Sequence, residues 1–159
     1  MKITELSTAY AKVHLPAKIA LVATQKPDNG YNLITVEWFM RTSIQPPMFA
    51  ISIGHNRFTH ECLEEHRFFN LIFPSVEMKQ LCAFSGSNSG KDVDKFAETD
   101  TKYIPGKLNK LPIPTEALAA FECEVTSQIR SGDHTIYIGE VKYSWVNAAK
   151  EPLIYQRKV

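Results

Sequence analysis

Short β-rich runs separated by turn residues constrain the fold of this chain more than any other feature. The clearest pair, Ile19–Gln25 and Tyr31–Phe39, is joined by a segment that ends in Asn29-Gly30. Asn-Gly between two such runs is a strong β-hairpin signal, because both residues tolerate the positive φ of a tight turn. Further runs of this kind occupy 48–53, 68–73, 121–125 and 134–146. With few helix-length crossovers between them, about six or seven strands predict an antiparallel barrel rather than a doubly wound sheet.

Helices are expected to be short and peripheral. Thr59–His66 contains helix formers with Thr59 as a possible N-cap, Ser75 caps a second segment through Phe84, and Asp92–Glu98 follows as one or two turns. Tyr103–Pro114 contains three prolines and is predicted to be an extended connector. No internal repeat or low-complexity segment interrupts the pattern. We therefore expect a mainly β fold and one domain over residues 1–159.

The charge balance limits the possible partners. The chain has 18 Lys and Arg against 17 Asp and Glu, a net charge of +1, whereas nucleic-acid and membrane-surface binders concentrate basic residues. The longest uncharged stretch, Thr42–Asn56, is too short to span a bilayer and contains Pro46-Pro47. Met1–Tyr10 shows no apolar signal-peptide segment. We expect a cytoplasmic protein that binds neither nucleic acid nor membrane.

Neither the cysteines nor the histidines predict a metal site or a disulfide framework. Cys62, Cys82 and Cys123 are odd in number and irregularly spaced, which indicates reduced thiols. His60 and His66 are six residues apart, so on a helix their rings would point about 240° apart. No metal is expected. The alternative is that the segment from His55 to His66 is not helical and gathers a metal.

Several familiar catalytic motifs are absent from the sequence. No two glycines stand two residues apart, which excludes a Gly-x-Gly-x-x-Gly dinucleotide turn. Gly86 to Lys91 is one residue short of a P-loop and is followed by Asp92. No Gly-x-Ser-x-Gly nucleophile elbow occurs. What remains is a set of polar segments placed between the predicted strands.

Five of these segments occur in the order of a known family pattern. They are Asn32 with Thr35, Thr42-Ser43 with Pro46-Pro47, Arg57 with Thr59, Ser89 to Phe96, and Gly132-Asp133-His134 with Gly139-Glu140-Val141. Through them the sequence resembles the flavin reductase-like, FMN-binding split-barrel family from about Pro16 to Tyr155. The Ser-Gly-Lys-Asp-Val-Asp-Lys-Phe run resembles the flavoredoxin-type branch in particular.

The resemblance implies a Greek-key-like split β-barrel with short peripheral helices, and a homodimer with one FMN per protomer near the subunit interface. It also implies an FMN-dependent oxidoreductase of the flavin reductase type. Such an enzyme accepts hydride from NAD(P)H and passes electrons to flavin or to a protein electron acceptor. Two alternatives stay open: a non-enzymatic, flavoredoxin-like FMN-binding electron carrier, and a barrel that has lost its flavin and serves as an interaction module.

The resemblance also assigns site residues. The expected FMN-binding residues are Asn32, Thr35, Trp38, Thr42, Ser43, Pro46, Arg57, Thr59, Ser89, Gly90, Lys91, Lys95 and Phe96. Because a phosphate dianion needs charge-assisted partners, Arg57 and Thr59 at a predicted helix start are its first candidates. Ser89, Gly90 and Lys91 are the second.

Other residues have competing interpretations. His134 is expected near the flavin, in a catalytic position that either places the nicotinamide or modulates the flavin. Trp38 equally suits a core or dimer contact. Asp94 and Lys95 equally suit an exposed ion pair that contributes little to stability.

Overall fold

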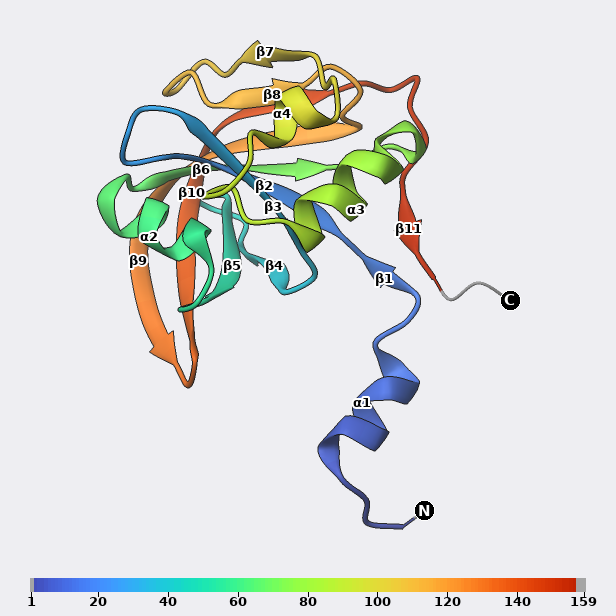
Figure 1. The fold of residues 1–159 in the computed structure, drawn as a ribbon. Helices are drawn as coiled ribbons and strands as arrows, with labels where there is room; N and C mark the ends of the chain where they lie inside the picture. The colour runs from blue at the N-terminus through green and yellow to red at the C-terminus, as the bar shows by residue number, and fades with distance from the viewer. Residues whose placement is uncertain (1, 157–159) are drawn as a thin grey trace.

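The computed structural model describes residues 2–156, and its centre is a seven-stranded antiparallel sheet (Figure 1). In chain order its strands are β2 (Ala20–Gln25), β3 (Tyr31–Val36), β4 (Phe39–Ser43), β5 (Met48–Gly54), β6 (Phe68–Phe73), β9 (Ala119–Ser131) and β10 (His134–Val146). The spatial order is β3-β2-β6-β9-β10-β5-β4. Neighbouring strands in this order pair antiparallel throughout.

The two edges of this sheet are held together by the chain itself. β3 and β4 lie at opposite ends of the spatial order, yet only Glu37 and Trp38 separate them in sequence. The backbone N–H of Ser52 on β5 donates to the Trp38 carbonyl oxygen at 2.9 Å, which extends the pairing of β4 with β5 back to this bend. A sheet whose outermost strands are joined by two residues has to curl until its ends meet. The expected mainly β, antiparallel barrel is confirmed.

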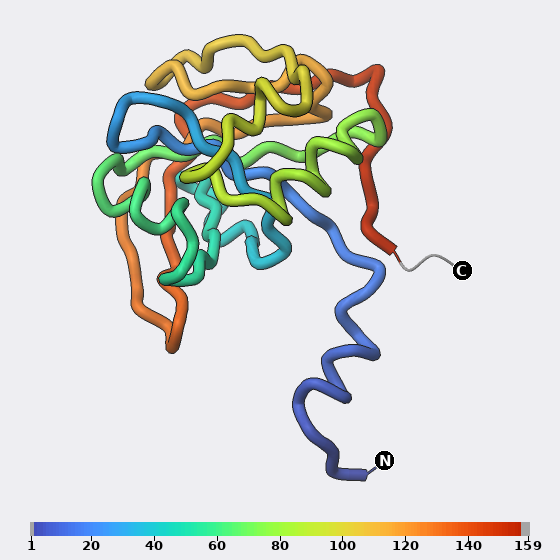
Figure 2. Tube along the Cα trace, viewed as in Figure 1, coloured from blue at the N-terminus to red at the C-terminus, as the bar shows by residue number. Residues whose placement is uncertain are grey.

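Short helices and the β7–β8 pair lie against the barrel, while α1 projects from it (Figures 1 and 2). The helices are α1 (Leu6–Val13), α2 (Phe58–Glu65), the 3₁₀ turn η1 (Val76–Met78), α3 (Lys79–Ser87) and α4 (Lys95–Glu98). Two further antiparallel pairs join β1 (Ala17–Lys18) to β11 (Ile154–Tyr155), and β7 (Tyr103–Pro105) to β8 (Pro112–Pro114). Among the described residues, no helix is long and apolar enough to cross a membrane.

Three differences from the expected elements have simple physical reasons. The run 31–39 divides into β3 and β4, because the chain bends at Glu37–Trp38 to pass from one sheet edge to the other. β9 runs to Ser131 rather than ending at Val125, because β10 pairs with it as far as the hairpin turn. Residues 126–131 are exposed, so this end of the strand does not need the alternation of apolar residues that the prediction used. The predicted connector 103–114 pairs with itself as β7 and β8. The sequence reasoning did not predict α1.

Two apolar clusters fill the space inside and beside the barrel. The first gathers residues of β2, β5, β6, β9 and β10, including Phe69 and Tyr137. The second lies where α3, α4 and β8 cover β2 and β6, and it includes Leu81 and Phe96. All three cysteines are buried and free, and burial raises the pKa of each thiol, in Cys62 to about 11. They are core residues with no sign of thiolate chemistry.

A buried carboxylate fixes the connection between β7 and β8. Glu122 is fully buried, and its oxygens accept hydrogen bonds from the backbone N–H groups of Lys107 at 2.9 Å and Leu108 at 2.6 Å. The indole N–H of Trp145 donates to the same carboxylate at 2.7 Å. Three N–H donors replace the water that Glu122 loses on folding, and the connection is thereby held against the barrel.

Candidate flavin site

Two neighbouring pockets lie along β3, close to where the resemblance places its site residues. The first has a volume of about 220 Å³ and the second about 300 Å³. The first is lined by Asn32, Ile34, Asn56, Arg57, Phe58, Thr59, Ser85, Gly86, Ser87, Asn88, Ser89, Gly90 and Lys95. The second is lined by Ile34, Thr35, Val36, Glu37, Trp38, Ser52, Ile53, Gly54, Arg57 and His134. Ile34 and Arg57 belong to both linings, so the pockets adjoin.

Asn32 organises the first pocket from β3. Its buried side-chain amide donates to the hydroxyls of Thr24 at 3.2 Å and Thr59 at 2.8 Å, which ties the start of α2 to the sheet. The side-chain oxygen Oδ1 of Asn32 lies against Gly90, where a Cβ atom would stand only 2.0 Å away from it. The loop after α3 can close over β3 because Gly90 has no side chain.

Lys95 brings a buried positive charge to the first pocket. The side chain is only 4% exposed, and its ammonium donates to the carbonyl oxygens of Leu33 at 2.6 Å and Ser85 at 2.9 Å. No carboxylate among residues 2–156 forms an ion pair with it. Burial, with the nearby charges of Lys26 and Arg57, lowers the pKa of Lys95 to about 8.

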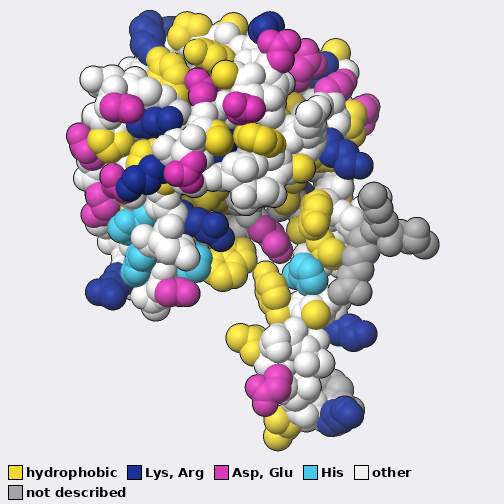
Figure 3. All heavy atoms as spheres, viewed as in Figure 1, with side chains coloured by type: hydrophobic (Ala, Val, Ile, Leu, Met, Phe, Trp, Pro, Cys, Tyr) yellow, Lys and Arg dark blue, Asp and Glu magenta, His cyan; other side chains and the backbone are white. Residues whose placement is uncertain are grey.

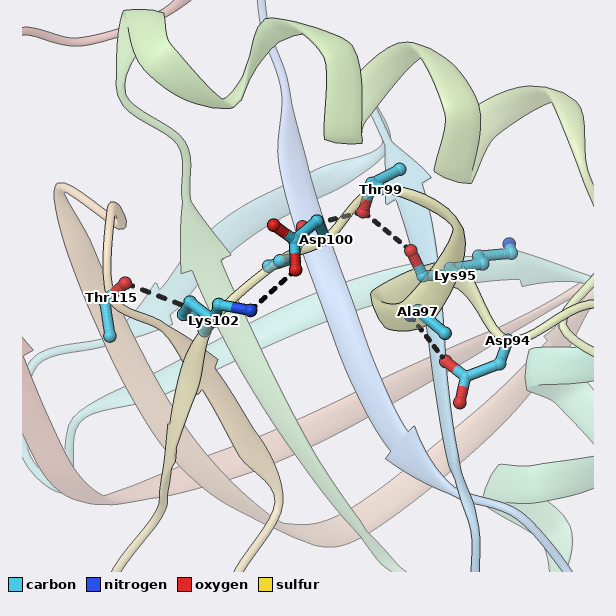
Figure 4. Close-up of polar contacts among 8 residues, drawn as sticks. Asp94, Lys95, Ala97, Thr99, Asp100, Lys102 and Thr115 are labelled. Carbon is cyan, nitrogen blue, oxygen red and sulfur yellow. Dashed lines mark hydrogen bonds and ion pairs between the residues drawn. The ribbon is translucent and has the colours of Figure 1, made fainter.

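The neighbouring Asp94 does not neutralise Lys95. The Asp94 carboxylate accepts from the backbone N–H groups of Phe96 at 3.0 Å and Ala97 at 3.2 Å, and so caps the start of α4. Figure 4 shows the Lys95 side chain extending away from that carboxylate. The exposed Asp94–Lys95 ion pair considered above is wrong, because the two side chains serve different partners.

A buried hydroxyl without a hydrogen-bond partner among residues 2–156 belongs to the lining of the same pocket. The Ser85 hydroxyl is buried and has no hydrogen-bond partner within the described part of the chain. Arg57, at the mouth of the pocket, forms no ion pair with a described carboxylate. A buried ammonium, a buried hydroxyl and a guanidinium that all lack an anionic partner there fit a bound phosphate, which would supply the missing acceptors.

The second pocket has an aromatic rim. Trp38 packs on the ring of His134, with centroids 4.7 Å apart and planes inclined by 39°. His134 Nδ1 lies 2.6 Å from the Asp133 carboxylate, a contact that lowers the pKa of Asp133. Trp38 is half exposed. Ile34, Val36 and Ile53 give this pocket apolar surface beside the aromatic pair, and such surface suits a fused ring system.

The histidines near α2 form a hydrogen-bond network. His55 Nε2 lies 3.1 Å and His60 Nε2 3.0 Å from the Thr135 hydroxyl, while Cys62 is on the buried side of α2. Within residues 2–156, no group of three or more His, Cys, Asp or Glu side chains is arranged to hold a metal ion.

Most of the chain matches one protein-family model. The model described as "Flavin reductase like domain" matches residues 13–159. The chain belongs to the flavin reductase-like family.

Solved structures with this flavin reductase-like fold cover nearly the whole chain. An FMN-binding protein of Thermus thermophilus, solved with bound p-hydroxybenzaldehyde, is 28% identical, with a TM-score of 0.83, over 99% of this chain and 90% of its own. Flavoredoxin of Desulfovibrio vulgaris, at 23% identity and a TM-score of 0.77 over 91% of this chain and 90% of its own, shares the fold.

Curated relatives of this flavin reductase-like chain include proteins with a named activity. The NADH-dependent flavin reductase StyB of Pseudomonas fluorescens is 28% identical over 84% of this chain and 74% of its own length. An uncharacterized Archaeoglobus fulgidus protein is 30% identical over 69% of this chain. The match to that protein spans 62% of its length.

The family pattern and the pockets agree for most of the expected site residues. Asn32, Arg57, Thr59, Ser89, Gly90 and Lys95 line the first pocket, and Thr35, Trp38, Arg57 and His134 line the second. Sequence reasoning missed Ser85, Asn56 and Phe58. The signal for Ser85 was its place at the start of the Ser/Gly/Asn stretch, which suggested free hydroxyls without saying which one faces inward.

Five expected site residues lie outside both linings. Thr42, Ser43 and Pro46 stand at the end of β4 and in the turn that follows. Lys91 is exposed, 3.6 Å from Glu61 and 5.8 Å from the centre of the Phe58 ring. Phe96 is buried in the second apolar cluster, 4.9 Å from the ring of Tyr103. In the single chain, none of these five residues is placed to contact a ligand in either pocket.

Proposed function

We propose that this protein is an FMN-dependent oxidoreductase of the flavin reductase type. It accepts hydride from NADH or NADPH and passes electrons to free flavin or to a protein acceptor. A homodimer in the cytoplasm is its working form. The named activity of the StyB relative and the FMN-binding description of the Thermus protein support this reading.

The single observation that carries the proposal is that the first pocket gathers two cations without an anionic partner and a buried hydroxyl without a hydrogen-bond partner among the described residues. Lys95 and Ser85 are buried and Arg57 stands at the mouth, with no anionic partner for any of them among residues 2–156. Burying such groups is costly unless a ligand satisfies them. A terminal phosphate dianion suits that end of the site, which favours FMN as the cofactor.

The first pocket fixes one end of the ligand. Lys95 and Arg57 neutralise the phosphate charge, and the Ser85 hydroxyl donates a hydrogen bond. Asn32, held by Thr24 and Thr59, keeps the β3 side of the pocket and the start of α2 in place. Because these groups are ordered before binding, little conformational entropy is lost when the ligand enters.

The second pocket adjoins the first and would take the ring system. When bound there, FMN supplies the acceptance of hydride and the onward transfer of electrons. Trp38 and His134 form the aromatic rim past which a nicotinamide has to approach. Asp133 orients the His134 ring through Nδ1, so that Nε2 stays toward Gly54 at the pocket wall.

Two measurements on the purified protein test the proposal. The visible spectrum shows whether flavin co-purifies, and titrations with FMN and FAD compare the two cofactors. NADH and NADPH oxidation is then followed with FMN present. We expect tighter binding of FMN than of FAD, and turnover with at least one nicotinamide.

Other outcomes would assign the protein differently. Tight FMN binding with no turnover on either nicotinamide selects the non-enzymatic electron carrier. A colourless protein whose melting temperature is unchanged by saturating FMN rejects both, since specific binding has to stabilise the folded state.

A further inference from the structure

Two histidine rings converge on one hydroxyl between α2 and β10. His55, just after β5, and His60, on α2, place their Nε2 atoms 3.1 Å and 3.0 Å from Oγ1 of Thr135 on β10. The two ring centroids are 5.0 Å apart, and Thr135 is buried. Figure 3 shows histidine side chains (cyan) gathered near α2. None of these three residues lines either of the two pockets, so the proposed function does not explain their arrangement.

A second polar contact joins the same helix to the same strand. The Glu64 carboxylate accepts a 2.6 Å hydrogen bond from the hydroxyl of the fully buried Tyr137. His60 and Glu64 share one face of α2 because they are four residues apart. Thr135 and Tyr137 are two residues apart on β10, so they point to the same side of the sheet. α2 is therefore fixed to β10 at two successive points.

The segment that these contacts hold carries part of the first pocket. Arg57 is the N-cap of α2, Phe58 and Thr59 are its first two residues, and all three line that pocket. His60 comes next, and its backbone N–H donates to the Arg57 carbonyl oxygen at 2.8 Å. On the opposite side, Thr59 is tied to Asn32 of β3. The start of α2 is thus held between β3 and β10, and its position on β10 decides where Arg57 lies.

The contact with Thr135 suits two uncharged rings. A hydroxyl carries one hydrogen, so Thr135 donates to one Nε2 and accepts from the other. Protonation of both His55 and His60 would make each Nε2 a donor. It would also place two positive charges on rings whose centroids are 5.0 Å apart, and like charges at that distance repel. The arrangement is therefore stable with neutral histidines and strained with charged ones.

The groups around the two rings do not remove this penalty. They are Glu64 on α2, Tyr137 on β10, Asp133 just before β10 and Arg67 before β6. Burial lowers the pKa of His60, the carboxylate of Glu64 opposes that shift, and His55 adds to it. Glu64 itself already accepts the hydrogen bond of Tyr137. Below the ordinary histidine pKa of 6.5, the unfolded chain thus takes up a proton that the folded chain resists.

We propose that the contact of His55 and His60 with Thr135 is a pH-sensitive clamp that positions the start of α2, and that acid releases it. The clamp touches no ligand and acts through Arg57 and Thr59. With uncharged rings, α2 is seated on β10 and the first pocket is ready for an anion. With both rings protonated, α2 loosens and FMN binds more weakly. The effect on FMN rests on the function proposed above, whereas the clamp itself is measured without flavin.

The first test measures hydrogen exchange in the flavin-free protein at about pH 7.5 and about pH 5.5, which bracket the ordinary histidine pKa. Protection factors of the α2 amides, which correct for the intrinsic pH dependence of exchange, are compared with those of β6. We expect α2 protection in the wild type to fall by about tenfold on acidification. It should stay constant in His60→Gln, because the amide side chain can hydrogen-bond and stays uncharged.

His14→Gln is the matched control for this measurement. His14 follows α1 and contacts Tyr10, away from the clamp, so the variant should show the wild-type pH dependence. Equal pH dependence in the wild type and His60→Gln would overturn the proposal.

The second test measures FMN dissociation constants over the same pH range. The FMN phosphate itself titrates near about pH 6, so the wild type is compared with His60→Gln at each pH. On acidification the wild type should lose at least about threefold more affinity than the variant. An equal loss of affinity in both would overturn the coupling of the clamp to the pocket.

Substitutions of Thr135 separate the hydroxyl from simple packing. Thr135→Val removes the hydroxyl that both rings contact and should weaken FMN at about pH 7.5. Thr135→Ser keeps the hydroxyl and should restore the affinity. Identical affinities of the wild type and Thr135→Val would overturn the proposal. A wild type that binds no FMN at any pH contradicts the proposed function instead, and hydrogen exchange of α2 then still decides whether the clamp exists.

Discussion

The ammonium group of Lys95 donates to the backbone carbonyl of Ser85 at 2.9 Å, and the hydroxyl of the same serine is buried without a partner among the described residues. One residue of α3 thus positions a buried cation through its backbone and leaves its own side chain free for a ligand. The charge and the hydroxyl converge on one pocket through a contact that links α3 to α4.

Removing the buried cation should weaken FMN but not riboflavin. Lys95→Met keeps the length of the side chain and deletes a charge-assisted hydrogen bond, which is typically worth about 1.5–3 kcal/mol. FMN affinity should fall roughly ten- to a hundredfold. Flavin fluorescence titrations with both ligands measure the difference, and an equal loss for riboflavin would contradict a phosphate role. Lys91→Met is the control, because Lys91 lies outside both pockets and should change FMN affinity far less.

FMN affinity should also decline as the pH rises past 8. The pKa of Lys95 is lowered to about 8 in the flavin-free protein, so above that pH the ammonium increasingly loses its proton and its attraction for phosphate. Dissociation constants measured from about pH 7 to about pH 9.5, a range that brackets this pKa, should increase for the wild type. The Lys95→Met variant should show a flatter dependence, and identical slopes would remove Lys95 from the explanation.

The same lowered pKa predicts how stability changes with pH. Between about 8 and the ordinary value of 10.5, the unfolded chain holds the Lys95 proton and the folded chain does not. The contribution of Lys95 to the free energy of unfolding therefore rises with pH in that window and is lower below it. In urea unfolding, the free energy of unfolding of the wild type should rise relative to that of Lys95→Met between about pH 7.5 and about pH 10. A constant difference would contradict the assignment.

Gly90 should resist substitution where another glycine of the same segment does not. A Cβ at Gly90 would meet Asn32 Oδ1 at 2.0 Å, whereas a Cβ at Gly86 would stand 3.5 Å from Thr35, an ordinary contact. Gly90→Ala should lower the melting temperature and weaken FMN. Gly86→Ala, in helix α3, should leave the melting temperature unchanged or raise it slightly, since alanine is favoured over glycine in helices by roughly 0.5–1 kcal/mol. Thermal unfolding of both variants makes the comparison.

Glu122 should matter for stability and not for flavin. Glu122→Gln replaces one acceptor oxygen by an amide group that faces a backbone N–H, and an unsatisfied buried group costs about 1–3 kcal/mol. For a chain of this size the melting temperature should fall by about 2–4 °C per kcal/mol. Calorimetry measures this loss, while FMN affinity should remain at the wild-type value. A large loss of FMN affinity without a change in melting temperature would show that Glu122 acts on the site.

The sequence by itself determined the strand content and the family. β-rich runs with turn residues between them specify an antiparallel barrel locally, because alternation and turn chemistry act over a few residues. Five short segments in the right order were enough for the family, and most of the site residues expected from the resemblance line the two pockets. The helix after the fifth strand was also predicted from its residues, although its N-cap is Arg57 and not Thr59.

Only the tertiary structure decided which polar groups face the pockets. Lys95 and Lys91 are both lysines of one segment, but the capped turn of α4 turns the first inward while the second pairs with Glu61 in solvent. Ser85 was one of several equivalent serines until the packing of α3 on β3 buried it. Whether a side chain is buried, and whether it has a partner, depends on residues far apart in the chain. The local pattern that predicts strands and turns does not contain this information.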